Sequence, residues 1–269
     1  MATDKYLNDY YNGYDEDGRL ASRHGSVEFL TTMRYIEKHL NPGDRVLEIG
    51  AGTGRYSHAL ARRGYTVDAV ELIEHNIELF RKNTGPEEKI TVTQGNALDL
   101  TGFSDDTYDM TLLLGPMYHL FTKEDKQRAL SEAIRVTKEG GTIFTAYCIS
   151  DASILQYGFQ AGHIHELLSY QPLSGLMLGL KMPGYVAYSD PSVLFEIIRK
   201  EDIDELMADF NVTRLHYVAT DGYTNHMRET VDAMDDKTFA AYLDYHYFLC
   251  ERPDMVGLTH HALDIFKKG

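Results

Sequence analysis

The sequence predicts an α/β protein built on a doubly wound sheet of seven strands, most of them parallel. Three observations support this fold class. The apolar run at residues 46–49 passes into a turn with glycine at every second position, strand and helix patterns alternate as far as Cys148, and polar side chains follow the ends of successive strands. Such alternation is typical of a parallel sheet covered on both faces. We therefore expect a ligand site at the carboxyl ends of the strands.

The first elements surround the glycine turn. We expect Ser26 to cap a helix over residues 27–40, because apolar side chains recur on one face and the sequence at 41–43 ends the pattern. A buried strand follows at 46–49, and the glycines after it let the backbone turn sharply and approach a ligand. A helix over residues 56–63 then points its amide ends toward that ligand.

The same patterns predict the rest of the sheet. Apolar runs indicate strands, and amphipathic runs bounded by glycine, proline or a capping threonine indicate helices. In chain order we expect a strand at 66–71, a helix from about 71 to 83, strands at 90–93 and 108–114, a helix at 122–136 and a fifth strand entered through residues 136–144.

Beyond residue 150 the pattern loosens. We expect a helix over 151–170, followed by an apolar segment at 171–191 that is rich in proline and glycine. This segment either covers a substrate cavity or forms core or dimer contacts, and we favour the cover. The later elements are a helix at 202–208, a strand at 212–219, a helical insertion at 224–248 and a closing strand at 262–266.

Composition limits the partners. The 41 acidic and 26 basic residues leave a formal charge of -15, so a phosphate backbone is repelled and we expect no nucleic-acid partner. Two distant cysteines suit a reducing compartment. The polar, tyrosine-rich start is unlike a signal peptide, and no apolar run reaches membrane-spanning length. We therefore expect a cytoplasmic protein without membrane contact, either a monomer or a homodimer.

The glycine turn resembles a known family motif. Residues Glu48 to Gly54 read Glu-x-Gly-x-Gly-x-Gly, whereas the dinucleotide fingerprint would require a glycine at Arg55. The pattern instead resembles the first motif of class I S-adenosylmethionine-dependent methyltransferases, and the resemblance covers roughly residues 25–150. Later runs that resemble the family's pattern are the acid-ended strand at 66–71, the loop at 94–99, the strand and its exit at 108–120, and the turn at 136–144.

The resemblance implies a Rossmann-like fold, an antiparallel last strand, and S-adenosylmethionine as donor with S-adenosylhomocysteine as product. Glu71 at a strand tip can accept from both ribose hydroxyls, and Asn96 stands where the family more often has aspartate. The implied cofactor contacts are Glu48, Gly50, Ala51, Gly52, Glu71, Leu72, Asn96, Ala97 and Gly115. The corresponding division of the chain is a lid at 1–25, a cofactor-binding core at 26–150, a substrate cover at 151–211 and the closing strands at 212–269.

Catalytic candidates follow the fourth strand. Methyl transfer from a sulfonium is an in-line displacement, so positioning supplies most of the rate, and a general base adds to it only if the acceptor must lose a proton. Tyr118 and His119 come where the resemblance places the methionine end of the cofactor. His119 with an ordinary pKa near 6.5 would serve as a base, or would only orient the loop, while Tyr118 lines the pocket.

The amino terminus offers a second group of candidates. Tyr10, Tyr11, Arg19 and His24 lie in the segment that related enzymes often fold over the cofactor. Tyrosine rings can stack on a flat acceptor or surround a sulfonium. The alternative is a solvated arm with incidental tyrosines.

The histidine pairs are poor metal ligands. His163 and His165 are two positions apart and His260 and His261 are adjacent, a spacing that without a nearby carboxylate or cysteine partner is poor evidence for a metal site, so we expect no metal.

Two classes of function remain open. The first is methyl transfer to oxygen, nitrogen or carbon of a small molecule, which the charge and the apolar insertion favour. The second is methylation of RNA or protein. The fourth strand exits as Leu114-Gly115-Pro116-Met117, without the asparagine-proline-proline type tetrapeptide of many nucleic-acid amino-methyltransferases, and this weakens the second class. A cofactor-binding module without turnover is a third alternative.

Overall fold

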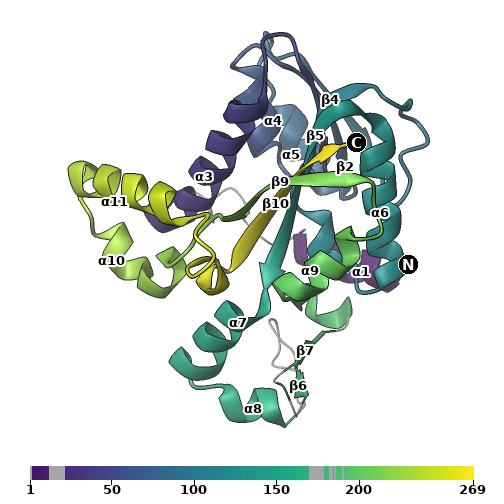
Figure 1. Ribbon diagram of the computed structural model, residues 1–269. Helices are drawn as coiled ribbons and strands as arrows, with labels where there is room; N and C mark the ends of the chain where they lie inside the picture. Colours follow the sequence, from purple (N-terminus) through teal and green to yellow (C-terminus); the bar gives the residue numbers. More distant parts are fainter. Residues whose placement is uncertain (1, 12–21, 170–178, 182–183, 185, 190) are drawn as a thin grey trace.

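The computed structural model describes residues 2–11, 22–169, 179–181, 184, 186–189 and 191–269. A central sheet carries helices on both sides, and a small lobe that includes α8 and the β6–β7 hairpin extends from one end (Figure 1). The strands are β1 (Arg45–Ile49), β2 (Thr66–Glu71), β3 (Ile90–Gln94), β4 (Tyr108–Leu113), β5 (Thr137–Ile149), β6 (Gly179–Lys181), β7 (Val186–Tyr188), β8 (Ile197–Ile198), β9 (Val212–Ala219) and β10 (His261–Lys268).

The strand order confirms the predicted fold class. The sheet runs β3-β2-β1-β4-β5-β10-β9, with parallel pairing from β3 to β5 and antiparallel pairing of β10 to both of its neighbours. The two-residue strand β8 pairs with the end of β5 and adds an eighth, unpredicted strand. Because β10 is antiparallel, its first residue lies at the same edge of the sheet as the last residues of β1, β2 and β4.

The helices frame this sheet. They are α1 (Ala2–Tyr11), α3 (Arg23–His39), α4 (Arg55–Ala61), α5 (Glu74–Asn83), α6 (Lys123–Val136), α7 (Ser150–Ser153), α8 (Ile164–Leu168), α9 (Lys200–Met207), α10 (Arg228–Asp232) and α11 (Asp236–Leu249), with a π-helix η2 (Ile154–Gln160) and 3-10 turns η1 (Pro116–His119), η3 (Pro191–Val193), η4 (Thr224–Met227) and η5 (Val256–Leu258).

Successive residues of the central strands pack on opposite faces. In β1, Val46 belongs to the core that includes Ile36 of α3, whereas Leu47 belongs to the core that includes Leu130 of α6 and Ile203 of α9. Both faces are therefore buried, which explains the continuous apolar runs in the sequence. All five of these side chains are fully buried.

The first predicted helix starts earlier than expected. Ser22, not Ser26, is the N-cap of α3, because its side chain accepts from the Gly25 amide. The Ser26 hydroxyl instead donates to the carbonyl of Arg23. The prediction of Ser26 as the cap is therefore wrong, and the helix begins at Arg23.

Two long predicted helices are broken in the structure. The segment predicted as one helix over 151–170 contains α7, η2 and α8, and Gly162 interrupts it with φ 83°. The insertion at 224–248 contains η4, α10 and α11, because Asp235 opens a new helix by accepting from the Thr238 amide at 2.7 Å. The expectation of uninterrupted helices is wrong in both segments.

The apolar segment at 171–191 lies largely outside the described residues. Its described part includes the antiparallel strands β6 and β7. Among the residues that the structure describes, no helix is long and apolar enough to cross a membrane.

Candidate functional site

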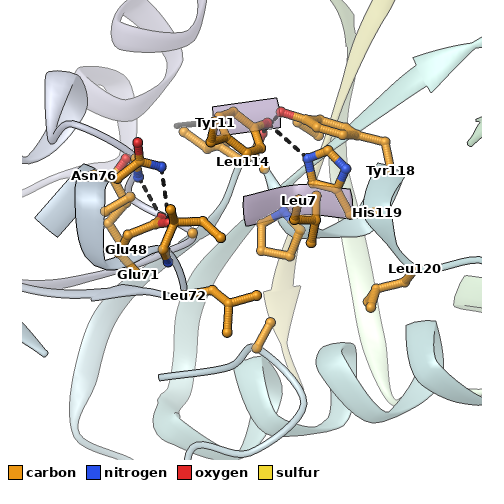
Figure 2. A pocket seen from close by; sticks show the side chains of 18 of the residues that line it. Leu7, Tyr11, Glu48, Glu71, Leu72, Asn76, Leu114, Tyr118, His119 and Leu120 are labelled. Atoms are coloured by element: carbon orange, nitrogen blue, oxygen red, sulfur yellow. Dashed lines mark hydrogen bonds between the residues drawn. The ribbon is translucent and has the colours of Figure 1, made fainter. Parts of the chain in front are cut away.

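A cavity of about 270 Å³ opens at the carboxyl ends of the parallel strands. Figure 2 shows side chains from the tips of β1, β2 and β4, from η1 and from α1 around this one space. Its walls include every residue that the sequence selected for the cofactor, together with both catalytic candidates: Glu48, Gly50, Ala51, Gly52, Glu71, Leu72, Asn96, Ala97, Gly115, Tyr118 and His119.

The glycine turn forms one wall of the cavity. Gly50 has φ 73°, a backbone conformation that strains any residue with a side chain. A Cβ placed on it would also lie 2.6 Å from Cδ of Pro116 and would clash with that ring. The amide of Gly50 donates to the carbonyl of Val70 at 2.8 Å. The turn is therefore held against β2 and leaves its open side to the cavity.

Glu71 connects the tip of β2 to that turn. One carboxylate oxygen accepts from the Gly52 amide at 2.8 Å, and the other accepts from the Ile73 amide at 2.9 Å and from the Asn76 side chain at 3.2 Å (Figure 2). Burial raises the pKa of Glu71, although these hydrogen bonds oppose the shift. Glu71 thus orders the turn in addition to facing the cavity.

Glu48 is buried behind the turn. Its carboxyl accepts from both the amide and the hydroxyl of Ser57, in the first turn of α4. Burial raises the pKa of Glu48 to about 8, so the protonated form predominates at neutral pH. Glu48 therefore fixes α4 to β1 and contributes a largely neutral polar group to the wall.

The loop at residues 94–99, which follows β3, is stabilised by its own turn. The side-chain oxygen of Asn96 accepts from the Leu98 amide at 2.9 Å, a local bond that an asparagine supplies as readily as an aspartate. The neighbouring Ala97 is buried and lines the cavity beside Leu72. This part of the wall offers apolar surface for a flat ring.

Two aromatic side chains and a histidine meet at the tip of β4. The Nδ1 atom of His119 lies 2.8 Å from the carbonyl oxygen of Leu194, and its Nε2 atom lies 3.0 Å from the hydroxyl of Tyr11 (Figure 2). A carbonyl can only accept, so Nδ1 carries the proton and Nε2 accepts from Tyr11. Tyr118 packs edge-on against the imidazole and donates to the carbonyl of Leu114 at 3.2 Å.

The protonation of His119 differs from the sequence expectation. Burial lowers its pKa to about 4, whereas an ordinary value near 6.5 was expected. The expected pKa is therefore wrong, because apolar and aromatic neighbours replace water around the ring. A neutral imidazole with a defined acceptor atom is the consequence.

The amino-terminal candidates separate in the structure. Tyr11 lines the cavity, while Tyr10 packs edge-on against Phe195 with ring centroids 5.9 Å apart. His24 does not line the cavity and contacts Asp232 through its amide at 3.0 Å and its Nδ1 at 2.7 Å. The remaining candidate of this segment, Arg19, lies outside the described residues.

Sequence reasoning did not select several wall residues. Glu28 and Thr32 of α3 line the cavity, as does His261 of β10. The Nδ1 atom of His261 lies 2.8 Å from a carboxylate oxygen of Asp221 and 3.5 Å from one of Glu28. The expectation that this histidine has no carboxylate partner is therefore wrong, because strand pairing joins residues that are distant in the sequence.

Three carboxylate and imidazole groups thus meet within 4.8 Å, a geometry that could hold a metal ion. The oxygens of Asp221 already accept from the Asn225 side chain, the Thr259 hydroxyl and the His260 amide. A carboxylate with that many donors is better suited to orienting His261 than to ligating a cation.

Known proteins share this motif arrangement. Residues 46–141 match the family described as a methyltransferase domain. The chain is 27% identical over 168 residues to a glycine/sarcosine N-methyltransferase from Aphanothece halophytica, covering 61% of this chain and 62% of that protein. It is 33% identical over 101 residues to a demethylmenaquinone methyltransferase from Clavibacter sepedonicus, covering 38% and 40% of the respective lengths. The chain therefore spans less than two thirds of either relative.

The fold comparison extends over most of the chain. A solved S-adenosylmethionine-dependent methyltransferase from Methanosarcina mazei superimposes with a TM-score of 0.58 at 16% identity, covering 87% of this chain and 96% of the other. At 16% sequence identity this superposition shows that the two proteins share a fold, and it shows nothing about the substrate. Together with the glycine turn, the match shows that residues 46–141 form a methyltransferase domain, on a fold shared with solved S-adenosylmethionine-dependent methyltransferases.

Proposed function

We propose that this chain transfers a methyl group from S-adenosylmethionine to a small-molecule acceptor. The observation that carries the proposal is the continuity of the cavity. Glu71 at the tip of β2, the glycine turn after β1 and His119 after β4 face one space. In a doubly wound sheet this edge is where ligands bind, so donor and acceptor can be held there side by side.

The wall chemistry supports the orientation of the donor. Glu71 receives three hydrogen bonds from the protein, and a carboxylate has about four acceptor positions. Its remaining acceptor capacity, with modest movement of Asn76, suits the two ribose hydroxyls. The adenine ring would then lie against Leu72 and Ala97, with Asn96 at its edge and the methionine end near Gly115.

The reaction itself requires little covalent chemistry from the protein. The methyl group moves from sulfur to the acceptor, the sulfur keeps the electron pair of the broken bond, and an acceptor hydroxyl or ammonium must lose a proton. Positioning of the two reactants can supply up to about 7–11 kcal/mol of the barrier reduction. We infer that His119 takes the proton at Nε2, with the Tyr11 hydroxyl passing it on from the acceptor.

A small acceptor is supported by two features. The formal charge of -15 disfavours a nucleic-acid substrate, and the relatives named above act, by their names, on glycine or sarcosine and on demethylmenaquinone. These acceptors differ in size and polarity. The family alone therefore does not select the acceptor.

The test is release of S-adenosylhomocysteine. Purified protein is incubated with S-adenosylmethionine and a panel of small amines, alcohols, phenols and quinols, and the product is quantified by mass spectrometry. We expect acceptor-dependent release from at least one small compound. Methylation of bulk RNA or protein without any small-molecule turnover would instead favour a macromolecular acceptor. Cofactor binding without turnover of either kind would favour a binding module.

A further inference from the structure

Helix α11 buries one side and exposes the other, at the periphery of the molecule beside α3 and α10 (Figure 1). On the inner side, Nε2 of His246 lies 3.0 Å from the hydroxyl oxygen of Thr31 in α3, and the hydroxyl of Tyr242 lies 2.7 Å from that of Thr224. These contacts fix the rotation of α11 about its axis. With about 3.6 residues per turn, six exposed residues share the opposite side, and we call them the outer face: Lys237, Ala240, Ala241, Asp244, Tyr245 and Phe248.

The outer face is largely apolar. Four of its six residues are alanine or aromatic. Tyr245 and Phe248 are 61% and 66% exposed, the two highest values among the large hydrophobic side chains that the structure describes, and their rings stack with centroids 6.4 Å apart. A solvated helix carries charged and polar side chains on the side away from the core, so this composition indicates a surface that another molecule covers.

The charges of the outer face are complementary to those of a second copy. Lys237 and Asp244 are placed symmetrically about the midpoint between Ala240 and Ala241. They lie about 10.5 Å apart along the helix axis, too far to pair with each other within one copy. If two copies of α11 pack antiparallel with this midpoint on a twofold axis, Lys237 of each copy faces the partner's Asp244. One type of contact is then made twice, and both contacts join opposite charges.

The same arrangement accounts for the apolar residues. The two alanines lie at the axis, where small side chains let helices approach to about 8 Å. Tyr245 lies beside the partner's Lys237, whose ammonium can contact the face of the ring. Phe248 lies over the start of the partner's helix. Burial of the two aromatic rings of each copy drives the association, and the charge pairs fix its register.

We propose that the outer face of α11 binds a second copy of this chain, in an antiparallel twofold dimer with Lys237 of each copy against the partner's Asp244. None of the six outer-face residues lines the cavity, so both cavities of the dimer stay open to ligands, and the proposal does not depend on methyl transfer. A single helix face offers less surface than a standard interface of about 800 Å² per partner. The dissociation constant is therefore expected in the micromolar range.

The test is sedimentation velocity across the micromolar range of protein concentration, with two charge variants. Asp244→Lys places two lysines at each contact, and Lys237→Asp places two aspartates there. Each variant alone should dimerise at least tenfold more weakly than the wild type. An equimolar mixture of the two variants should regain association close to that of the wild type, because both contacts of the mixed dimer join opposite charges. Both side chains are exposed, so the thermal unfolding midpoints should stay close to wild type.

A third variant tests the aromatic contact. Phe248→Ser should also weaken dimerisation at least tenfold, because it removes a ring that the partner covers. Phe159→Ser is its control, since Phe159 is 59% exposed but belongs to η2. Glu139→Lys is the control for the charge variants, because Glu139 is exposed near the start of β5, whereas α11 ends beside Ala219 at the other edge of the sheet. Both controls should dimerise as the wild type does.

Three results would overturn the proposal. The first is a wild-type protein that stays monomeric across the whole concentration range. The second is a dimer that persists unchanged in the charge variants and in Phe248→Ser, which would place the interface on another surface. The third is a mixture of the two charge variants that stays as weakly associated as each variant alone, which would contradict the antiparallel register.

Discussion

Glu71 shows how one side chain combines two tasks at a strand tip. It is nearly fully buried and holds the amides of Gly52 and Ile73, and it also faces the proposed ribose position. The sequence indicated the acid at the strand end but not its bonds to the glycine turn. Those bonds depend on the parallel pairing of β1 and β2, which places residues 19 positions apart in contact.

We predict that Glu71→Ala weakens S-adenosylhomocysteine binding by about 1.5–3 kcal/mol or more, because a charge-assisted hydrogen bond is lost and the buried amides are left unpaired. Isothermal titration calorimetry measures this change. Glu78→Ala is the control, since Glu78 is exposed on α5. Wild-type affinity in Glu71→Ala would remove Glu71 from the cofactor site.

The lowered pKa keeps the His119 imidazole neutral at neutral pH, so the base proposed above is already in its proton-accepting form. We predict that His119→Ala lowers turnover of an acceptor found by screening by about 100-fold or more, with little change in cofactor affinity. The lowered pKa, about 4, also predicts no loss of rate from this residue as the pH falls from 8 to 5.5. Steady-state kinetics across this pH range test both statements.

The control for this variant is His165→Ala, because His165 is exposed on α8. A loss of turnover below tenfold in His119→Ala would leave positioning as the main source of rate. An inflection near pH 6.5 that disappears in His119→Ala would contradict the lowered pKa.

Glu48 couples stability to pH. Its folded-state pKa of about 8 lies above the ordinary 4.5, so the stability that it contributes is fully present below pH 4.5 and is lost as the pH rises toward 8. We predict that Glu48→Gln loses less stability than wild type between pH 5 and pH 8. One pKa unit corresponds to about 1.4 kcal/mol. The loss of unfolding free energy between these two pH values should differ between wild type and Glu48→Gln by more than this amount. Urea unfolding at both pH values measures it, and identical pH dependence in the two proteins would contradict the assignment.

At the scale of elements, the sheet was predictable and the insertions were not. β1, β2 and β4 are buried on both faces, and their apolar runs are unambiguous. The break between α10 and α11 depends on a single capping aspartate, Asp235, inside an otherwise helical pattern. The start of α3 depends on which of two serines, Ser22 or Ser26, accepts the first amide, and sequence patterns do not distinguish them.

The amino-terminal helix packs across the cavity. Leu7 of α1 is buried against Ile73 and Leu194, and Tyr11 contacts His119. We predict that S-adenosylhomocysteine slows amide exchange in α1 and at residues 191–198, because a ligand beneath them disfavours local opening. Hydrogen–deuterium exchange by mass spectrometry measures this, with the exposed helix α11 as the internal reference. Unchanged exchange in α1 with ligand would mean static packing and not a lid.

At the scale of the whole molecule, the site joins residues from both halves of the chain. The wall predicted to hold the cofactor follows motifs between residues 48 and 115, and these could be read from the sequence because each follows its own strand. The opposite wall combines Glu28 with Thr220 and His261, which meet only because β10 is inserted between β5 and β9. No local pattern predicts that contact, so this wall could be identified only from the structure.

The most direct test of the central claim is a calorimetric titration of the wild-type protein with S-adenosylhomocysteine, S-adenosylmethionine and, for comparison, a nicotinamide dinucleotide. We predict one site per chain for the first two ligands, with a dissociation constant in the micromolar range. This corresponds to a binding free energy of about -8 kcal/mol. The dinucleotide should give no measurable heat. A preference for the dinucleotide, or no binding of either sulfur-containing ligand, would contradict the account.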